Sequence, residues 1–309
     1  MNAQTALLPV AAAARHSFDS PLQSRVLEDV LHLQNLPLES ATLPALDVAY
    51  RLVGPVGAPV VAVLGGISAH RRALTVRGES GSPGWWQRVL YDPALRLADR
   101  YQVLTLDWLG GPDGTRIPPA AGPAPRRPVI TTADQAAVLI RLLDGLGISR
   151  LAAVISASYG GMVAQHLCAA VPGRVGQAII LGCAHRPDAM ALARRHIQRE
   201  ILRLVDDERG VALARSLAMT TYRSGAEFNA RFGATGGGDG LLAYLDHHGR
   251  KFARRFDARS YTCLMDSIDG HEFPPARLVT PTTLLGFTTD ELCPPDLVRS
   301  FAEALPRLR

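Results

Sequence analysis

Residues 151–161 (LAAVISASYGG) combine a short apolar strand, a tight turn and the beginning of a helix. Ser158 lies in the turn, with Ser156 two positions before it and Gly160 two positions after it. A turn that presents a serine hydroxyl between a strand and a helix is so sharp that both of these positions require small residues. Ser158 is therefore a candidate nucleophile. Taken alone, the segment also fits a glycine-rich turn with surface serines, because Ser156 stands where a glycine is usual.

A second loop fits the oxyanion hole that a serine nucleophile needs. Such a site requires two backbone N–H groups that point at the developing negative charge. We expect Tyr159, which follows the candidate nucleophile, to supply one, and a loop after an earlier strand to supply the other. Residues 64–68 (LGGIS) lie where the apolar run 59–65 ends, so Ile67 is the expected second donor. In isolation, an ordinary turn accounts for the two glycines equally well.

Asp290 is the candidate for the acid of a catalytic triad. It follows the last predicted strand, residues 282–287, and so comes after the serine in the chain, which is the order of this class of site. Pro294 and Pro295 follow closely, and an aspartate before them also fits a cap of a turn or helix.

The order of the predicted elements indicates a mostly parallel sheet with helices on both faces, because strands and helices alternate. We predict strands at residues 46–53, 59–65, 101–107, 151–155, 177–181 and 282–287, and helices at residues 132–146 and 160–170. With the serine turn, this pattern predicts an α/β-hydrolase fold. We expect an N-terminal tail and lead-in over residues 1–40, a core over 41–183 and 278–309, and a helical lid insertion over 184–277.

Composition excludes several other classes of protein. The chain has 309 residues, of which 47% are hydrophobic and 20% charged, so it can bury a large core. Its net charge of +5 is spread along the chain, which argues against a nucleic-acid partner. The four cysteines lie apart, without metal-ligand spacing, so we expect no metal site. No apolar run reaches the roughly 20 residues of a membrane helix. We therefore expect a cytoplasmic protein without a membrane partner.

Several segments between about Leu46 and Pro306 resemble the homoserine O-acyltransferase family, the MetX type of α/β-hydrolase enzyme. One group of matches surrounds the serine turn, and a second lies in the predicted lid. The matching segments are residues 109–111 (LGG) with 114–115 (GT), 131–135, 146–148 (LGI), 158–162 (SYGGM), 210–215 (GVALAR), 221–224 (TYRS), 228–233 (FNARFG) and 249–261 (GRKFARRFDARSY).

The resemblance implies a function and roles for particular residues. The function is transfer of an acetyl or succinyl group from acyl-CoA to the hydroxyl of L-homoserine in methionine biosynthesis, by a ping-pong mechanism. Ser158 is then the nucleophile, Asp290 the triad acid, and Arg215 and Tyr222 residues that bind the amino-acid substrate. The acyl-CoA is a co-substrate, and no cofactor is bound permanently. Because members of the family are often dimers through the lid, a homodimer is compatible with the resemblance.

The chain also departs from the family, and these departures leave alternatives open. Ser156 and Tyr159 replace the usual glycine and methionine of the serine turn. The family's catalytic histidine comes from a loop near the C-terminus, but no histidine follows Asp290. We therefore expect this histidine beyond Arg309, in a longer protein. Serine as the acceptor, an esterase or deacetylase activity, and a catalytically degenerate family member remain alternatives. The choice between acetyl and succinyl donors is also open.

Overall fold

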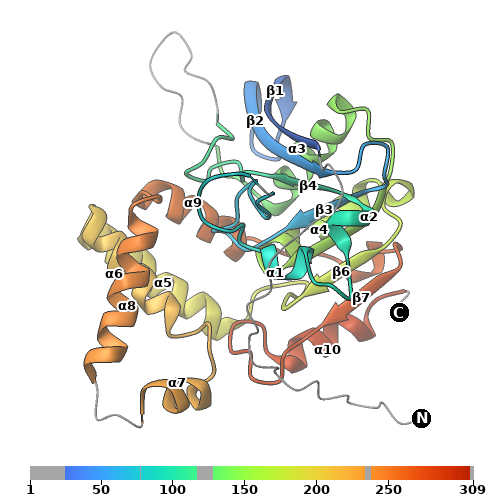
Figure 1. The fold of residues 1–309 in the computed structure, drawn as a ribbon. Helices are drawn as coiled ribbons and strands as arrows, with labels where there is room; N and C mark the ends of the chain where they lie inside the picture. The colour runs from blue at the N-terminus through green and yellow to red at the C-terminus, as the bar shows by residue number, and fades with distance from the viewer. Residues whose placement is uncertain (1–24, 77, 117–127, 234–237, 307–309) are drawn as a thin grey trace.

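The computed structural model describes residues 25–76, 78–116, 128–233 and 238–306, and a seven-stranded sheet forms its centre (Figure 1). The sheet has the order β1-β2-β4-β3-β5-β6-β7. β1 pairs with β2, and β2 with β4, in antiparallel fashion, and the other neighbours are parallel. The strands are β1 Arg25–Pro37, β2 Thr42–Gly54, β3 Val60–Leu64, β4 Gln102–Leu106, β5 Leu151–Ala157, β6 Ala178–Leu181 and β7 Thr282–Leu285.

The central strand β3 is buried on both faces, which explains its continuous apolar sequence. Successive side chains of a strand point to opposite faces of the sheet. Val60, Ala62 and Leu64 accordingly pack in one hydrophobic core, and Val61 and Val63 pack in a second core on the other face.

Helices cover both faces of the sheet. α3 (Thr132–Gly145) and α4 (Tyr159–Ala170) pack together in the first core, and the short helices α1 (Gln87–Leu90) and α2 (Leu97–Arg100) contribute to the second. α10 (Pro295–Glu303) lies beside β7 at the edge of the sheet (Figure 1). The predicted mostly parallel sheet with helices on both faces is confirmed.

The N-terminal region differs from the sequence-based expectation. Residues 1–40 were expected to form a tail and lead-in. Residues 1–24 lie outside the described part of the chain, and β1 occupies Arg25–Pro37 and pairs with β2 along its length. β1 is an edge strand, and most of its side chains are exposed or half-buried, although Leu33 and Leu36 are buried. Its sequence therefore lacks the apolar run by which the other strands were predicted.

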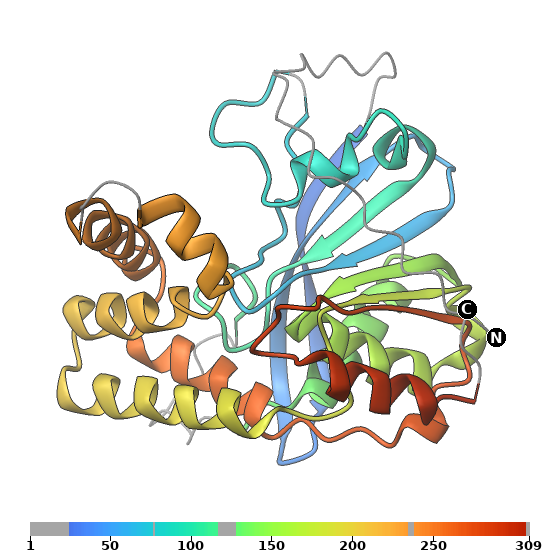
Figure 2. The same ribbon diagram turned by 90° about the horizontal axis from the view of Figure 1, so that it is seen from below.

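In the described residues, the segment between β6 and β7 contains five α-helices and a short 3-10 helix at Pro275–Arg277. The helices α5 to α8 stand together beside the sheet in both views (Figures 1 and 2). Most of them begin at a side chain that accepts hydrogen bonds from the first turn of the helix, as Asp188 does for α5 and Asp207 for α6. The helices are α5 Ala189–Leu204, α6 Glu208–Met219, α7 Gly225–Phe232, α8 Gly238–Ala253 and α9 Ala258–Asp269.

His271, which follows α9, should make the fold sensitive to acid. It is 2% exposed, and burial, reinforced by His166 and His185, lowers its pKa to about 3. In the unfolded chain a histidine has a pKa near 6.5. As the pH falls from about 6.5 towards 3, the unfolded state binds a proton that the folded state does not, so stability falls. We expect this residue to contribute about 2 kcal/mol of lost stability between pH 7 and pH 5.

Urea unfolding at the two pH values measures this loss. His271→Gln should reduce the pH dependence of the free energy of unfolding, whatever it does to the stability at pH 7. His196→Gln, which removes an exposed histidine from α5, is the matched control, and its pH dependence should exceed that of His271→Gln. Equal pH dependence in wild type and His271→Gln would contradict the prediction.

Candidate active site

Ser158 lies in a strained turn between β5 and α4. Its φ of 53° and ψ of −121° fall in a region that residues other than glycine rarely adopt. Its N–H donates to the carbonyl of Leu181 at the end of β6, at 2.9 Å, and its side chain is exposed. The turn therefore directs the hydroxyl outwards at the carboxyl end of the parallel strands, where α/β proteins bind their ligands.

Gly160 brings α4 against the end of β3. Its N–H donates to the carbonyl of Gly65 at 2.9 Å, and a Cβ at this position would lie 2.3 Å from the carbonyl oxygen of Leu64. Only glycine permits this approach. Ser156, in place of the usual glycine, is fully buried, and its hydroxyl donates to the carbonyl of Ile179 at 3.0 Å. The serine turn and the Gly65 loop are thus held side by side.

The loop after β3 contains Ile67, the expected oxyanion donor. The Ala69 N–H donates to the carbonyl of Gly66 at 2.9 Å, so residues 66–69 form a turn in which Ile67 is half-buried. Farther along the loop, the carbonyl of Ser68 accepts a hydrogen bond of 2.8 Å from Arg255. Arg255 also forms an ion pair with Asp113, and thereby joins the end of α8 to this loop.

Asp290 lies close to the same corner of the sheet. Its Oδ1 accepts hydrogen bonds from the N–H groups of Leu292 (2.8 Å) and Cys293 (3.0 Å), so the alternative role as a turn cap is also present. Its Oδ2 faces Gly182, on which a Cβ would lie 3.4 Å away. Because Gly182 directly follows Leu181, whose carbonyl binds the Ser158 N–H, the aspartate loop and the serine turn meet at the end of β6.

Arg215 and Tyr222, the two predicted substrate-binding residues, are in contact. The Arg215 guanidinium donates to the Tyr222 hydroxyl at 2.7 Å. Its central carbon lies 4.8 Å from the centre of the Tyr222 ring and 4.6 Å from that of Phe252. Burial raises the pKa of the neighbouring Tyr261, and the Arg215 charge opposes this rise. The Tyr222 and Phe252 rings thus hold the guanidinium in position.

Sequence reasoning assigned no role to Phe252 or Tyr261, although both lie in the family-like segment 249–261. Their spacing along the chain does not reveal that they surround Arg215, because this arrangement depends on how α6, α8 and α9 pack.

None of the histidines that the structure describes forms a hydrogen bond with Ser158 or Asp290. His70 lies in the Ile67 loop, and its pKa is lowered mainly by burial and also by Arg255. His166, on α4, packs edge-to-face against His271 and Phe273, with ring centres 5.5 and 5.2 Å apart.

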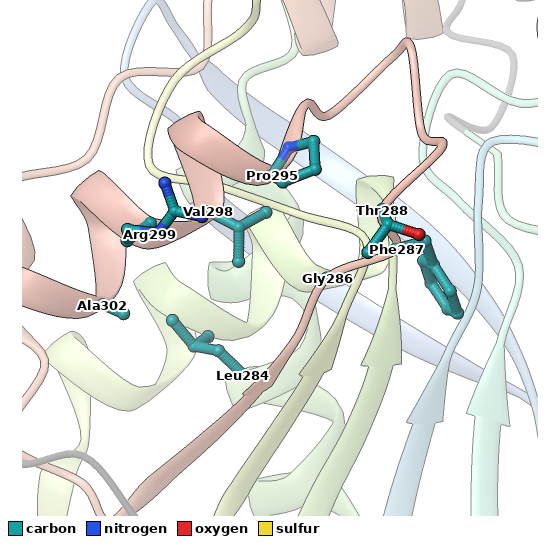
Figure 3. Close-up of a pocket in the computed structure, with 8 residues that line it drawn as sticks. All are labelled: Leu284, Gly286, Phe287, Thr288, Pro295, Val298, Arg299 and Ala302. Carbon is teal, nitrogen blue, oxygen red and sulfur yellow. The ribbon is translucent and has the colours of Figure 1, made fainter. Parts of the chain in front are cut away.

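A groove of about 410 Å³ lies between β7 and α10 (Figure 3). Its walls include Leu284 from the strand and Val298 and Arg299 from the helix. None of the residues that line it is a predicted site residue. The groove therefore adds nothing to the site built around Ser158.

The described part of the chain lacks the features of a metal site and of a membrane span. There, no cluster of three or more His, Cys, Asp or Glu side chains is placed to hold a metal ion. Over the same residues, every helix is too short or too polar to cross a membrane.

Comparison with known proteins agrees with this geometry. The sequence profile of the alpha/beta hydrolase fold family matches residues 74–309. Homoserine O-succinyltransferase of Xanthomonas campestris pv. campestris is 36% identical over 88% of this chain and 73% of that protein. Homoserine O-acetyltransferase of Clavibacter michiganensis subsp. michiganensis is 34% identical over 85% of this chain and 79% of that protein. The crystal structure of homoserine O-acetyltransferase from Staphylococcus aureus is 29% identical and matches with a TM-score of 0.79, covering 92% of this chain and 87% of that one. The chain belongs to the homoserine O-acyltransferase family of α/β-hydrolase-fold proteins.

Proposed function

We propose that this protein transfers an acyl group from acyl-CoA to the hydroxyl of L-homoserine. The observation that carries the proposal is the strained, exposed Ser158 at the end of β5, next to the Gly65 loop that Gly160 holds in place. The relatives named above share this family, and their names point to homoserine as the acceptor and to acetyl or succinyl as the group transferred.

In the first half of the reaction, the Ser158 oxygen attacks the thioester carbonyl of acyl-CoA. A general base takes the serine proton; in a Ser-His-Asp mechanism it would be a histidine paired with Asp290, and no described histidine hydrogen-bonds to Asp290. The backbone N–H groups of Ile67 and Tyr159 stabilise the negative charge on the carbonyl oxygen. The carbon–sulfur bond then breaks, the CoA sulfur leaves with the proton from the base, and the acyl group stays on Ser158 as an ester.

In the second half, the hydroxyl of the amino acid attacks this ester. The base takes the proton of the hydroxyl and returns it to the Ser158 oxygen as the ester bond breaks. Arg215 binds the carboxylate of the acceptor through two N–H groups, while Tyr222 holds the guanidinium in position. In this proposal, residues 184–277 form a lid that keeps out water, because water would hydrolyse the acyl-enzyme.

Two measurements test the proposal. Intact mass spectrometry after mixing with acetyl-CoA or succinyl-CoA, each alone, should reveal an acyl group on Ser158 with the donor that the enzyme uses. Release of free CoA thiol should then depend on added L-homoserine. Equal release without any acceptor would identify a hydrolase, and stronger stimulation by L-serine would identify a serine acyltransferase. Binding of acyl-CoA without acylation of Ser158 would identify a degenerate member.

We also propose that the protein is cytoplasmic and forms a homodimer through the lid. Large apolar side chains are exposed on the lid helices, with Ile197, Leu213 and Leu242 each more than half exposed. Burial of such side chains against a second copy would stabilise a dimer. Sedimentation of the wild type and of Leu242→Glu measures the assembly state; a monomeric wild type would contradict the dimer.

A further inference from the structure

Trp108 contacts both halves of the candidate oxyanion hole, although sequence reasoning gave it no role. It lies just after β4 and is 3% exposed. Its indole N–H donates to the carbonyl of Gly66 at 3.0 Å. Its ring packs against the Tyr159 ring, with centres 5.1 Å apart and planes at 79°.

The hydrogen bond to Gly66 fixes the direction of the Ile67 N–H. In a trans peptide the carbonyl and the N–H of the following residue point in opposite directions, and the described chain has no cis peptide bond. The Gly66 carbonyl is held by Trp108 and by the Ala69 N–H. The Ile67 N–H, on the other side of the same peptide, is therefore held pointing away from both.

The Gly66 backbone has open space on one side. A Cβ built on Gly66 would meet nothing within 4 Å. Glycine also permits more backbone conformations than any other residue. Two hydrogen bonds hold the Gly66 carbonyl and so orient the Ile67 N–H, and the one from Trp108 comes from outside the turn.

The Tyr159 half is fixed by a second set of contacts. The Ser158 carbonyl, which shares a peptide with the Tyr159 N–H, accepts hydrogen bonds from the N–H groups of Gly161 (2.8 Å) and Met162 (3.3 Å). The Tyr159 hydroxyl is held by Gln135 at 3.1 Å and by Ser267 at 2.8 Å. The Trp108 ring rests against this anchored side chain, so one residue connects the two donors.

We propose that Trp108 is a positioning residue of the oxyanion hole, which orients the Ile67 N–H and sets its place relative to the Tyr159 N–H. This inference rests on the proposed function, because it assumes that these two groups stabilise the oxyanion. Trp108 itself touches neither the serine nor the substrate in this mechanism.

Trp85, which lies just before α1, provides a matched control because its side chain binds the same loop. Its indole N–H donates to the carbonyl of His70 at 2.7 Å, three residues beyond Ile67. Trp85→Phe removes the same kind of hydrogen bond from the same loop, but it leaves the Gly66 carbonyl bound. Trp108→Phe removes the bond to Gly66 and keeps an aromatic ring against Tyr159.

The experiment compares wild type, Trp108→Phe and Trp85→Phe in three measurements. These are the rate of Ser158 acylation in a single turnover, the Kd of acyl-CoA, and the NMR signal of the Ile67 amide in ¹⁵N-labelled protein without ligand.

Loss of one oxyanion donor typically costs about 10²–10³ in rate. We expect Trp108→Phe to slow acylation by about tenfold to a hundredfold, with Kd changed less than about twofold, and to shift or broaden the Ile67 signal. Trp85→Phe should neither slow acylation nor change the Ile67 signal, even if it lowers Tm as much as Trp108→Phe does.

An Ile67 amide signal that is unchanged in Trp108→Phe would overturn the inference, as would equal slowing by the two variants. If Trp108→Phe does not fold, 3-benzothienylalanine at position 108 replaces it, since sulfur takes the place of the N–H in a ring of nearly the same shape. If the full-length wild-type protein is not acylated at all, the proposed function fails, and the Ile67 signal still decides whether Trp108 orients this peptide.

Discussion

Ser158→Ala should lower the rate of acyl transfer by roughly 10⁴–10⁶-fold while leaving the protein folded. The nucleophile and its base act as one unit, so removing the serine oxygen removes the covalent route altogether. The loss of stability should be small, within about 0.5 kcal/mol, because the Ser158 side chain is exposed. Steady-state assay of CoA release with L-homoserine, together with thermal unfolding, measures both effects.

Ser156→Ala is the natural control for this experiment. It removes a hydroxyl only two residues away, which donates to the Ile179 carbonyl, and should cost about 1 kcal/mol of stability with transfer largely retained. Near-normal transfer in Ser158→Ala would refute the assignment of the nucleophile and, with it, the proposed mechanism.

Arg215→Ala should raise the KM for L-homoserine by about tenfold to a hundredfold, because a charge-assisted hydrogen bond to a carboxylate contributes roughly 1.5–3 kcal/mol. The KM for acyl-CoA and the rate of Ser158 acylation should change little, since the acceptor enters only in the second half of the reaction. Arg215→Lys keeps the charge but loses the paired N–H groups, so its KM for L-homoserine should lie between those of wild type and Arg215→Ala.

An acceptor without a carboxylate separates substrate binding from support of the lid. With homoserinol, in which a hydroxymethyl group replaces the carboxylate, wild type and Arg215→Ala should perform alike. Arg203→Ala, which removes an exposed arginine from α5, serves as the control for loss of lid charge. Equal increases in the KM values of both substrates would mean that Arg215 only supports the lid.

The parts of the site that depend on local spacing could be predicted from the sequence. The small residues around Ser158, the glycines before Ile67 and the strand before Asp290 each constrain a few consecutive residues. The parallel strands of the core were predictable for a similar reason: a strand buried on both faces, such as β3, must be a continuous apolar run.

Features that depend on distant contacts could not be predicted in this way. Trp108 and Gly66 are 42 residues apart, and Arg255 and Ser68 are 187 apart. No periodicity in the sequence connects such pairs, and an isolated tryptophan after a strand fits a core position equally well. β1 was not predicted because an edge strand with few buried side chains carries little hydrophobic signal.

The close approach of Gly160 to the end of β3 also has a consequence for engineering. Because α4 begins directly against this strand, the serine turn and the Gly65 loop form one contiguous surface rather than two exchangeable loops. Larger residues at Gly65 or Gly160 would clash where the two segments meet. Acyl-donor preference should therefore be altered by randomising residues 66–68, while Gly65, Gly160 and the buried Tyr159 are kept fixed.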